Sequence, residues 1–365
     1  MNFTIDRERL LPSLQIINGV VERRHTLPIL SNFLLSIDES SMTLTGTDME
    51  VELIARINQG GERAEFTLPA RKLLDICRAL PESSSLDFTV KKDQVTMKSG
   101  KSRFTLATLP ANEFPSTEIT APDIDFQIEQ DKLRGLIEDT HFAMAQQDVR
   151  YYLNGLLLEV SKDLLRAVAT DGHRLAMKDV QYDTGANEIT QVIIPRKGVT
   201  ELLRLLDDNG KPAEIQISQN HIRIALEDMQ FTSKLIDGRF PDYERVVPET
   251  SDNRVVAERD ALRQSLTRAS ILSNEKYKGV RIMLRENSIK ALAHNPEHEE
   301  AEEELEVDYH GDEMEIGFNV SYLLDALSVI RTDKVILTIR DPNSSCLLLP
   351  DGDESCKYVV MPMRL

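Results

Sequence analysis

The pentapeptide "TDGHR" at residues 170–174 holds the side chains of this sequence that are best suited to acid–base chemistry. Asp171 and His173 are the residue types of a catalytic dyad, and a hydrolase could use such a pair. That reaction also needs a nucleophile, and no serine or cysteine in an elbow motif lies nearby. No second histidine stands at a metal-binding spacing. We therefore expect a turn or a binding site here, and a hydrolase is the competing hypothesis.

Two further patterns that could hold a cofactor or a metal do not meet the requirements. "SGKS" at 99–102 resembles part of a phosphate-binding loop, but the motif's first glycine would be at position 95, where the chain has Val95. Strands are expected on both sides of it, and no helix follows. Cys77, Cys346 and Cys356 show no CxxC spacing, so they indicate neither a zinc site nor a disulfide framework. The sequence predicts no cofactor and no metal.

The charges are unevenly distributed along the chain. The formal net charge is −18, which on its own argues against binding to DNA phosphates. Residues 295–317 hold eleven acidic side chains and no lysine or arginine, whereas basic residues gather in the predicted helices and at their ends. This suits a protein that offers nucleic acid one surface and repels it elsewhere. An ordinary acidic protein with solvated helices would show the same pattern.

The first residues, "MNFTIDRERLL", carry charge and lack the apolar core of a signal peptide. No apolar run approaches the roughly 18 residues that a membrane span requires. We expect a soluble, cytoplasmic protein that does not associate with membranes.

One stretch of the sequence occurs three times. "LPARKLLDICRALP" (68–81) returns as "IPRKGVTELLRLL" (194–206), and a similar shape without most of the basic residues follows as "GFNVSYLLDALSVI" (317–330). Around each copy lie an amphipathic helix, strand-like segments with the alternation of half-buried strands, and three short closing strands. The helix expected near residues 7–21 contains Pro12, which predicts a kink or a later start. The repeat predicts an α+β chain of three tandem lobes, each with two helices and two small antiparallel sheets: 1–120, 121–247 and 248–365.

Similar units joined head to tail either close into a ring or grow into a filament, depending on the rotation between them. A bead-like tandem without special geometry is the alternative. The repeat itself leaves these possibilities open.

Motifs along the whole chain carry a family resemblance. They are "TLPILSN" (26–32), "TGTD" (45–48), "DVRYYLNG" (148–155), "ATDGHRLA" (169–176), "PRKGV" (195–199), "DGRFPDY" (237–243), "SILSNEK" (270–276), "EIGFNVSY" (315–322) and "YVVMPMRL" (358–365). The chain closely resembles the β subunit of bacterial DNA polymerase III, the replicative sliding clamp. The resemblance implies the DNA clamp fold, with a head-to-tail homodimer of three-lobed chains forming a six-lobed ring around duplex DNA. It implies a non-catalytic processivity subunit that tethers the replicative polymerase.

The resemblance also implies partners. These are double-stranded DNA without sequence preference, a second copy of the chain, the DNA polymerase III catalytic subunit, and other polymerases and repair proteins that carry clamp-binding peptides. Because no P-loop is present, a separate clamp-loader ATPase is expected to open the ring. A clamp should contact phosphates weakly and read no bases. A monomeric DNA-binding module is the second competing hypothesis.

By the family's pattern, the residues expected to contact DNA are Arg24, Arg71, Lys72, Gln147, Tyr151, Tyr152, Arg196, Lys197, Tyr277 and Lys278. Residues 151 and 152 are expected in an extended segment, where adjacent side chains point in opposite directions, so that one tyrosine stays outside the core.

The resemblance further implies a hydrophobic peptide-binding pocket, formed by the second lobe and the apolar segment "VVMPMRL", which has no obvious strand partner for its last residues. Methionine suits a surface that adapts to several ligands. The expected pocket residues are Leu153, Thr170, Gly172, His173, Arg174, Leu175, Pro241, Arg245, Val246, Ser345, Val359, Val360, Met361, Pro362 and Met363. The alternative is that this segment only caps the last sheet.

For ring closure, the resemblance pairs the edge of the first lobe with the edge of the third lobe of the other copy. The expected interface has a basic side and an acidic side around an apolar centre, which is electrostatically complementary. Its residues are Lys101, Arg103, Phe104, Leu106, Ile271, Leu272, Glu300, Glu302 and Glu303.

Overall fold

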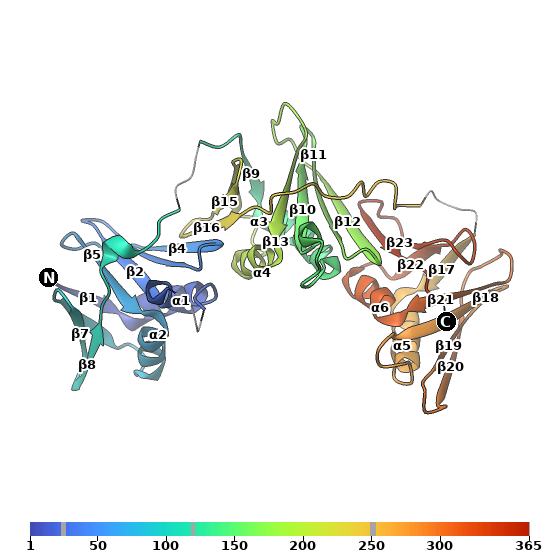
Figure 1. Cartoon of the computed structure of the whole chain (residues 1–365), viewed down its shortest axis with the longest axis horizontal. Helices are drawn as coiled ribbons and strands as arrows, with labels where there is room; N and C mark the ends of the chain where they lie inside the picture. Colours follow the sequence, from blue (N-terminus) through green and yellow to red (C-terminus); the bar gives the residue numbers. More distant parts are fainter. Residues whose placement is uncertain (23–26, 118–120, 249–252, 365) are drawn as a thin grey trace. The chain divides into compact units, whose positions relative to one another are not determined.

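The computed structural model describes residues 1–22, 27–117, 121–248 and 253–364. They divide into two compact units, one of Met1–Asp131 with Lys197–Leu235 and one of Lys132–Arg196 with Ile236–Leu365. Each unit contains one eight-stranded and one four-stranded antiparallel sheet (Figure 1). The division runs through the predicted middle lobe, so each unit joins one outer lobe to part of the middle one.

The large sheet of the first unit has the order β5-β2-β3-β4-β16-β15-β14-β9. Its strands are β2 (Asn32–Ile37), β3 (Met42–Thr47), β4 (Val51–Ile57), β5 (Ala64–Pro69), β9 (Ile124–Glu129), β14 (Pro212–Ile217), β15 (His221–Ala225) and β16 (Met229–Lys234). At its centre β4 pairs with β16, with Leu53 opposite Phe231. Both side chains are fully buried.

The small sheet of the first unit has the order β1-β6-β7-β8. Its strands are β1 (Asn2–Asp6), β6 (Ser85–Val90), β7 (Gln94–Ser99) and β8 (Ser102–Ala107). Helices α1 (Arg7–Ile17) and α2 (Ala70–Ala79) contact each other, and α1 packs on β3 and β4. Helix α4 (Arg196–Leu205) is divided between the units. Arg196 belongs to the second unit, and the residues from Lys197 onward belong to the first. The 3-10 helices η1 (Pro28–Ser31) and η2 (Ala111–Glu113) complete this unit.

The large sheet of the second unit has the order β13-β10-β11-β12-β24-β23-β22-β17. Its strands are β10 (Gly155–Val160), β11 (Leu164–Thr170), β12 (Arg174–Gln181), β13 (Thr190–Pro195), β17 (Arg254–Glu258), β22 (Lys334–Thr338), β23 (Cys346–Pro350) and β24 (Cys356–Val360). Strand β24 lies between β12 and β23, with Val359 opposite both Leu175 and Leu347. These three residues belong to one hydrophobic cluster.

The small sheet of the second unit has the order β20-β19-β18-β21. Its strands are β18 (Gly279–Arg285), β19 (Ser288–His294), β20 (Glu300–Glu306) and β21 (Met314–Asn319). Helix α5 (Arg259–Ser270) packs on β19 and β20 and contacts α6 (Val320–Val329). Helix α3 (Gln130–Glu138) and the 3-10 helices η3 (His141–Ala143) and η4 (Tyr151–Leu153) precede β10. No helix in the described part of the chain is long and apolar enough to cross a membrane.

The side-chain pattern explains why these segments fold as they do. In α1 the buried residues Leu10, Leu14 and Ile17 recur at helical spacing and form one apolar face. Helix α1 begins at Arg7 with Pro12 inside it, so the predicted later start is wrong. A proline at this position removes one backbone donor and leaves only the carbonyl of Glu8 without its helical partner. Burial of this apolar face stabilises the helix by more than the one missing hydrogen bond costs.

The two helices of each predicted repeat are present, and neighbouring repeats share an eight-stranded sheet. The pairs β4–β16 and β12–β24 fuse inner sheets across the expected lobe junctions. Strand pairing of this kind depends on tertiary proximity, which the alternation of a single strand does not reveal.

Candidate functional site

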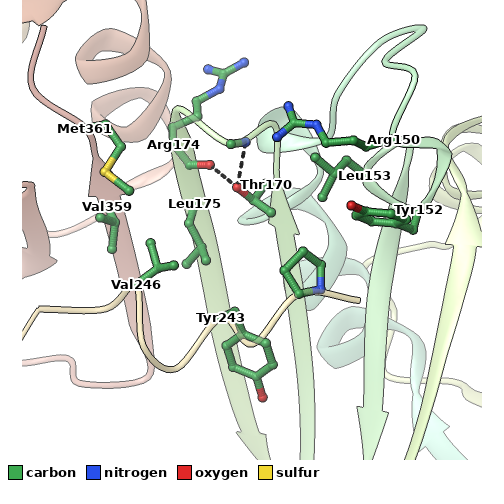
Figure 2. Close-up of a pocket in the computed structure, with 12 residues that line it drawn as sticks. Arg150, Tyr152, Leu153, Thr170, Arg174, Leu175, Tyr243, Val246, Val359 and Met361 are labelled. Carbon is green, nitrogen blue, oxygen red and sulfur yellow. Dashed lines mark hydrogen bonds between the residues drawn. The ribbon is translucent and has the colours of Figure 1, made fainter. Parts of the chain in front are cut away.

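A pocket of about 160 Å³ lies in the second unit beside the β12–β24 pair (Figure 2). Its lining is mostly apolar and continues into the hydrophobic cluster below it. The lining residues are Arg150, Tyr152, Leu153, Thr170, Gly172, Arg174, Leu175, Pro241, Tyr243, Val246, Val359 and Met361. A concave apolar surface with a few polar groups at its edge is the usual form of a ligand site.

The turn between β11 and β12 builds one edge of the pocket. The Thr170 hydroxyl donates to the Arg174 carbonyl at 2.6 Å and accepts from the Gly172 N–H at 3.0 Å, as drawn in Figure 2. Gly172 has φ +89°, a left-handed conformation that side chains disfavour. The Asp171 carboxylate accepts from the N–H groups of His173 and Arg174, at 2.9 and 3.0 Å. The sequence "TDGHR" therefore folds as a closed turn.

The same contacts decide the catalytic hypothesis for this turn. Asp171 also accepts from Arg174 Nε at 3.2 Å, so its oxygens serve the backbone and an arginine. The His173 ring instead stacks on Tyr322, with ring centroids 6.5 Å apart. Within the described ranges no group of three or more His, Cys, Asp or Glu side chains is arranged to hold a metal ion. Asp171 and His173 are thus parts of a turn and a ring stack.

Tyr243 forms another wall and is held by charged groups from the sheet. Its hydroxyl donates to Glu159 at 3.0 Å and accepts from Arg166 at 3.1 Å. Arg166 is in turn held by Asp179 at 2.6 and 2.8 Å. Burial raises the pKa of Tyr243 to about 12, so the hydroxyl keeps its proton at neutral pH. This network fixes the connecting segment 236–248 on the sheet.

The segment "VVMPMRL" has backbone partners after all, contrary to the expectation from sequence. Val359 and Val360 belong to β24, and beyond it the Met361 N–H donates to the His173 carbonyl at 2.9 Å. The Met363 N–H donates to the Gly317 carbonyl at 2.8 Å. Because adjacent strand residues face opposite sides, Val359 lines the pocket and Val360 does not.

The structure brings most of the predicted pocket residues together. Those that line the pocket are Leu153, Thr170, Gly172, Arg174, Leu175, Pro241, Val246, Val359 and Met361. Those that do not are His173, Arg245, Ser345, Val360, Pro362 and Met363. The physical reasons differ, since His173 stacks on Tyr322 and the exposed Arg245 pairs with Asp242 at 2.7 Å. Ser345, Pro362 and Met363 are half-buried outside the lining.

Three lining residues were not among the predicted pocket residues. They are Arg150, Tyr152 and Tyr243. Tyr243 ends the motif "DGRFPDY", two positions after Pro241, so the motif itself was the available signal. The resemblance places Tyr152 among the DNA contacts, and the extended segment expected for residues 151 and 152 is wrong, because residues 151–153 form the 3-10 helix η4. There Tyr151 is 58% exposed, while Tyr152 faces the pocket.

The predicted DNA contacts fall into two groups. Arg24 lies outside the described residues. Four further residues are exposed: Arg71 and Lys72 in the first turn of α2, Gln147, and Tyr277. Lys278 is half-buried, with φ +49°.

Arg196 and Lys197 are instead engaged by the protein itself. Arg196 donates to the Met144 carbonyl at 2.9 Å, and burial lowers its pKa. Lys197 pairs with the buried Asp48 and with Glu22, the latter at 2.9 Å. Burial opposes the charge on Lys197, yet the two carboxylates raise its pKa above the ordinary value. Two carboxylates on one ammonium leave little net attraction for phosphate.

The predicted dimer residues lie on two unpaired sheet edges. Strand β8 ends one small sheet and carries Arg103, Phe104 and Leu106, with Lys101 just before it. Strand β20 ends the other small sheet and carries Glu300, Glu302 and Glu303. Edge strands present unpaired backbone groups that can add a further strand.

The helix that packs on the acidic edge ends in an exposed apolar side chain. Ile271 at the end of α5 is 74% exposed, while Leu272 is half-buried. Glu303 already pairs with Arg268 of its own chain, at 2.5 and 2.8 Å, and this hydrogen bonding lowers its pKa. Glu302 likewise pairs with Lys290 at 2.6 Å, so ion pairs within the chain already neutralise part of the charge of this edge.

Comparison with known proteins covers the whole chain. Models of the DNA polymerase III beta subunit match residues 1–118 as its N-terminal domain, 127–242 as its central domain and 244–364 as its C-terminal domain. The beta sliding clamp of Pseudomonas putida KT2440 is 54% identical over 367 residues, which are 100% of both chains. The crystal structure of the Pseudomonas aeruginosa DNA polymerase III subunit beta matches with a TM-score of 0.98 and 53% identity, again over 100% of both chains.

A second Pseudomonas aeruginosa structure, of the sliding clamp bound to griselimycin, matches with a TM-score of 0.97, 53% identity and 100% coverage of both chains. Together with the continuous sheets and the repeated two-helix lobes, these matches establish the α+β clamp fold. The chain belongs to the DNA polymerase III β-subunit family of sliding clamps.

Proposed function

We propose that two copies of this sliding clamp close head to tail into a six-lobed ring that encircles duplex DNA and tethers the DNA polymerase III catalytic subunit. The proposal takes 1–120, 121–247 and 248–365 as the three lobes. The observation that carries it is the pair of unpaired edges, basic and apolar on β8 and acidic on β20, with the exposed Ile271 at the end of α5, the helix that packs on β20. Opposite charge across an interface favours the correct partner and register. A separate clamp-loader ATPase would open the ring in the cytoplasm.

The family's role is that of a non-catalytic processivity subunit, so binding surfaces carry the function. We infer that DNA contact is electrostatic and weak, made through phosphates by exposed cations such as Arg71 and Lys72. A ring needs no tight grip, because topology prevents escape. The acidic remainder of the chain disfavours DNA elsewhere.

The second proposed role belongs to the pocket. Its apolar lining and the adaptable thioether of Met361 suit a short peptide with apolar anchors. Replicative and other polymerases, the clamp loader and repair proteins would then compete for one site. Arg150, at the pocket edge, is held by Asp148 at 2.8 and 3.0 Å.

Ring topology predicts a specific behaviour on DNA. Clamp loaded by its loader and ATP onto nicked circular DNA is expected to remain bound during gel filtration, and to be lost after a restriction enzyme linearises the circle. The physical reason is that a ring slides off free ends without breaking any strong contact. Equal retention on circular and linear DNA would reject the ring and favour a monomeric DNA-binding module.

The phosphate contacts can be tested by charge removal on α2. We expect Arg71→Gln with Lys72→Gln to weaken DNA binding and to make the slope of log K against log salt shallower by roughly 2, because each phosphate contact contributes about 0.9. Anisotropy of a labelled duplex over a salt series gives the slope. Lys91→Gln with Lys92→Gln removes the same charge from the exposed turn between β6 and β7 and serves as the matched control. An equal change in both variants would show a general charge effect and no contact at α2.

A further inference from the structure

Arg174, at the pocket edge, is held by an unusually complete set of partners. Its guanidinium pairs with Asp171 at 3.2 Å and with Asp325, and it donates to the Phe142 carbonyl at 3.0 Å. It also lies over two aromatic rings, 4.5 Å from the centroid of Tyr322 and 5.5 Å from that of Phe142. Only 13% of the side chain is exposed. Two carboxylates, a carbonyl and two π faces therefore fix one cation.

These partners come from two distant parts of the sequence. Asp171 and Phe142 belong to the same segment of the chain as Arg174 itself. Asp325 and Tyr322 lie on α6, and Asp325 comes 151 positions after Arg174 in the sequence. Asp325 pairs with the lining residue Arg174 and is not itself among the residues that line the pocket. Helix α6 therefore contacts the pocket edge through this ion pair and the ring of Tyr322, and it also packs against β24.

The position of Arg174 matters for the shape of the pocket. Figure 2 shows its guanidinium directed away from Leu175 and Val246, so that the pocket edge is formed by its backbone and its aliphatic stem. If Asp325 lost its charge, Asp171 at Nε and the Phe142 carbonyl at Nη2 would remain, but Nη1 would lose its carboxylate partner. The long side chain would then regain rotamers, including those that place a solvated cation over the apolar lining.

We propose that Asp325 is a positioning residue of the peptide pocket: from α6 it holds Arg174 out of the apolar lining and so couples the packing of α6 to peptide affinity. This inference rests on the proposed peptide-binding function. Coupling of this kind is reciprocal, so a bound peptide must also stabilise the contact of α6 with Arg174.

The chain contains a matched control at the other end of the same helix. Arg331, just beyond α6, pairs with Glu138 at 3.1 Å and with Asp139 at 3.3 Å. These ion pairs also join the α6 region to the segment that contains the pocket, but none of the three residues lines it. Arg331→Gln therefore removes a comparable ion pair without touching Arg174.

The experiment measures binding of a fluorescein-labelled peptide, taken from the clamp-binding segment of the DNA polymerase III catalytic subunit, by fluorescence polarisation. Asp325→Asn is expected to raise Kd by roughly five- to tenfold, and Asp325→Glu to restore most of the affinity. Arg331→Gln is expected to stay within about twofold of the unchanged chain. In an Arg174→Ala background, Asp325→Asn is expected to have no further effect, because the group that it positions is gone.

Hydrogen exchange gives a second readout that a purely structural role would not move. Peptide should slow exchange of the α6 amides in the unchanged chain and in Arg331→Gln, but not in Asp325→Asn. Equal losses of peptide affinity in Asp325→Asn and Arg331→Gln would overturn the proposal, because both would then act by destabilising the fold around α6. A full loss of affinity on adding Asp325→Asn to Arg174→Ala would overturn it as well. Unchanged affinity in Asp325→Asn, with the unchanged chain binding normally, rejects the positioning role alone. No binding by the unchanged chain rejects the peptide function together with it.

Discussion

Replacing Ile271 and Leu272 with alanine is expected to convert the clamp from a dimer of twice 41.3 kDa into a monomer. Ile271 is 74% exposed in the single chain, although isoleucine is among the residues most often buried. Truncating two apolar side chains at the centre of an interface costs about 1–2 kcal/mol for each. A head-to-tail dimer has two such interfaces, so the total is about 4–8 kcal/mol, or three or more orders of magnitude in Kd.

Sedimentation at low micromolar protein measures the mass directly. Ile189→Ala is a suitable control, because Ile189 is 69% exposed but lies between β12 and β13 and belongs to neither proposed edge strand. It should leave the dimer intact. A dimer that persists in dilute Ile271→Ala, Leu272→Ala protein would reject the assignment of this interface, and a monomer in the unchanged chain would make the monomeric DNA-binding module the better hypothesis.

Deleting residues 361–365 is expected to abolish peptide binding while the dimer survives. The deletion removes Met361 from the pocket wall and with it the backbone bond to His173 that orients the segment. Loss of a central anchor typically costs 2 kcal/mol or more, and an open wall readmits water. We expect Kd for the labelled polymerase peptide to rise by about a hundredfold or beyond measurement.

A point substitution separates the side chain from the backbone of this segment. Met361→Lys keeps the chain length and places a cation at the pocket wall, so it should reproduce most of the loss. Sedimentation of both variants should still give the dimer mass, and their unfolding temperatures should stay near that of the unchanged chain. Peptide affinity that is unaffected by the deletion would refute the assignment of the pocket.

At the equivalent register of its own fused sheet, the first unit carries a carboxylate where the second unit carries an apolar side chain. Leu175 lies opposite Thr170 and Val359, and in the same register Glu52 lies opposite Thr47 and Thr232. Glu52 is only 6% exposed, burial raises its pKa, and it accepts from the Thr117 hydroxyl at 3.2 Å.

The backbone bond that Met361 makes has a counterpart too. The Lys234 N–H donates to the Glu50 carbonyl at 2.8 Å, as the Met361 N–H donates to that of His173. The fold supplies the same framework twice, and side-chain chemistry makes one copy apolar and the other polar. This also gives Met361→Lys a natural precedent within the chain.

Local patterns sufficed to predict the elements, and the repeat sufficed to predict their order. The helical spacing of Leu10, Leu14 and Ile17 predicts the buried face of α1, and the helix forms from Arg7 to Ile17 although Pro12 lies inside it. The fusion of β4 with β16 was not predictable in this way, because the pairing partner of an edge strand depends on what lies beside it in space.

The site was predictable only where the resemblance supplied positions. Residue type alone could not distinguish Arg71, which is exposed, from Lys197, whose charge is used by Asp48 and Glu22. Nor could it show that Tyr152 faces the pocket, since this follows from the turn of η4. The exposure of a cation and the direction of an aromatic ring depend on tertiary packing, which residue type does not reveal.

The central place of β24 in its sheet has a consequence for synthesis on the ribosome. This strand is translated later than every other strand of that sheet, yet it lies in the middle, between β12 and β23. Until it emerges, both neighbours present open edges, and such edges invite pairing with other chains. Nascent or prematurely terminated chains that lack β24 should therefore aggregate or be degraded, and they would also lack Val359, a wall of the proposed peptide pocket.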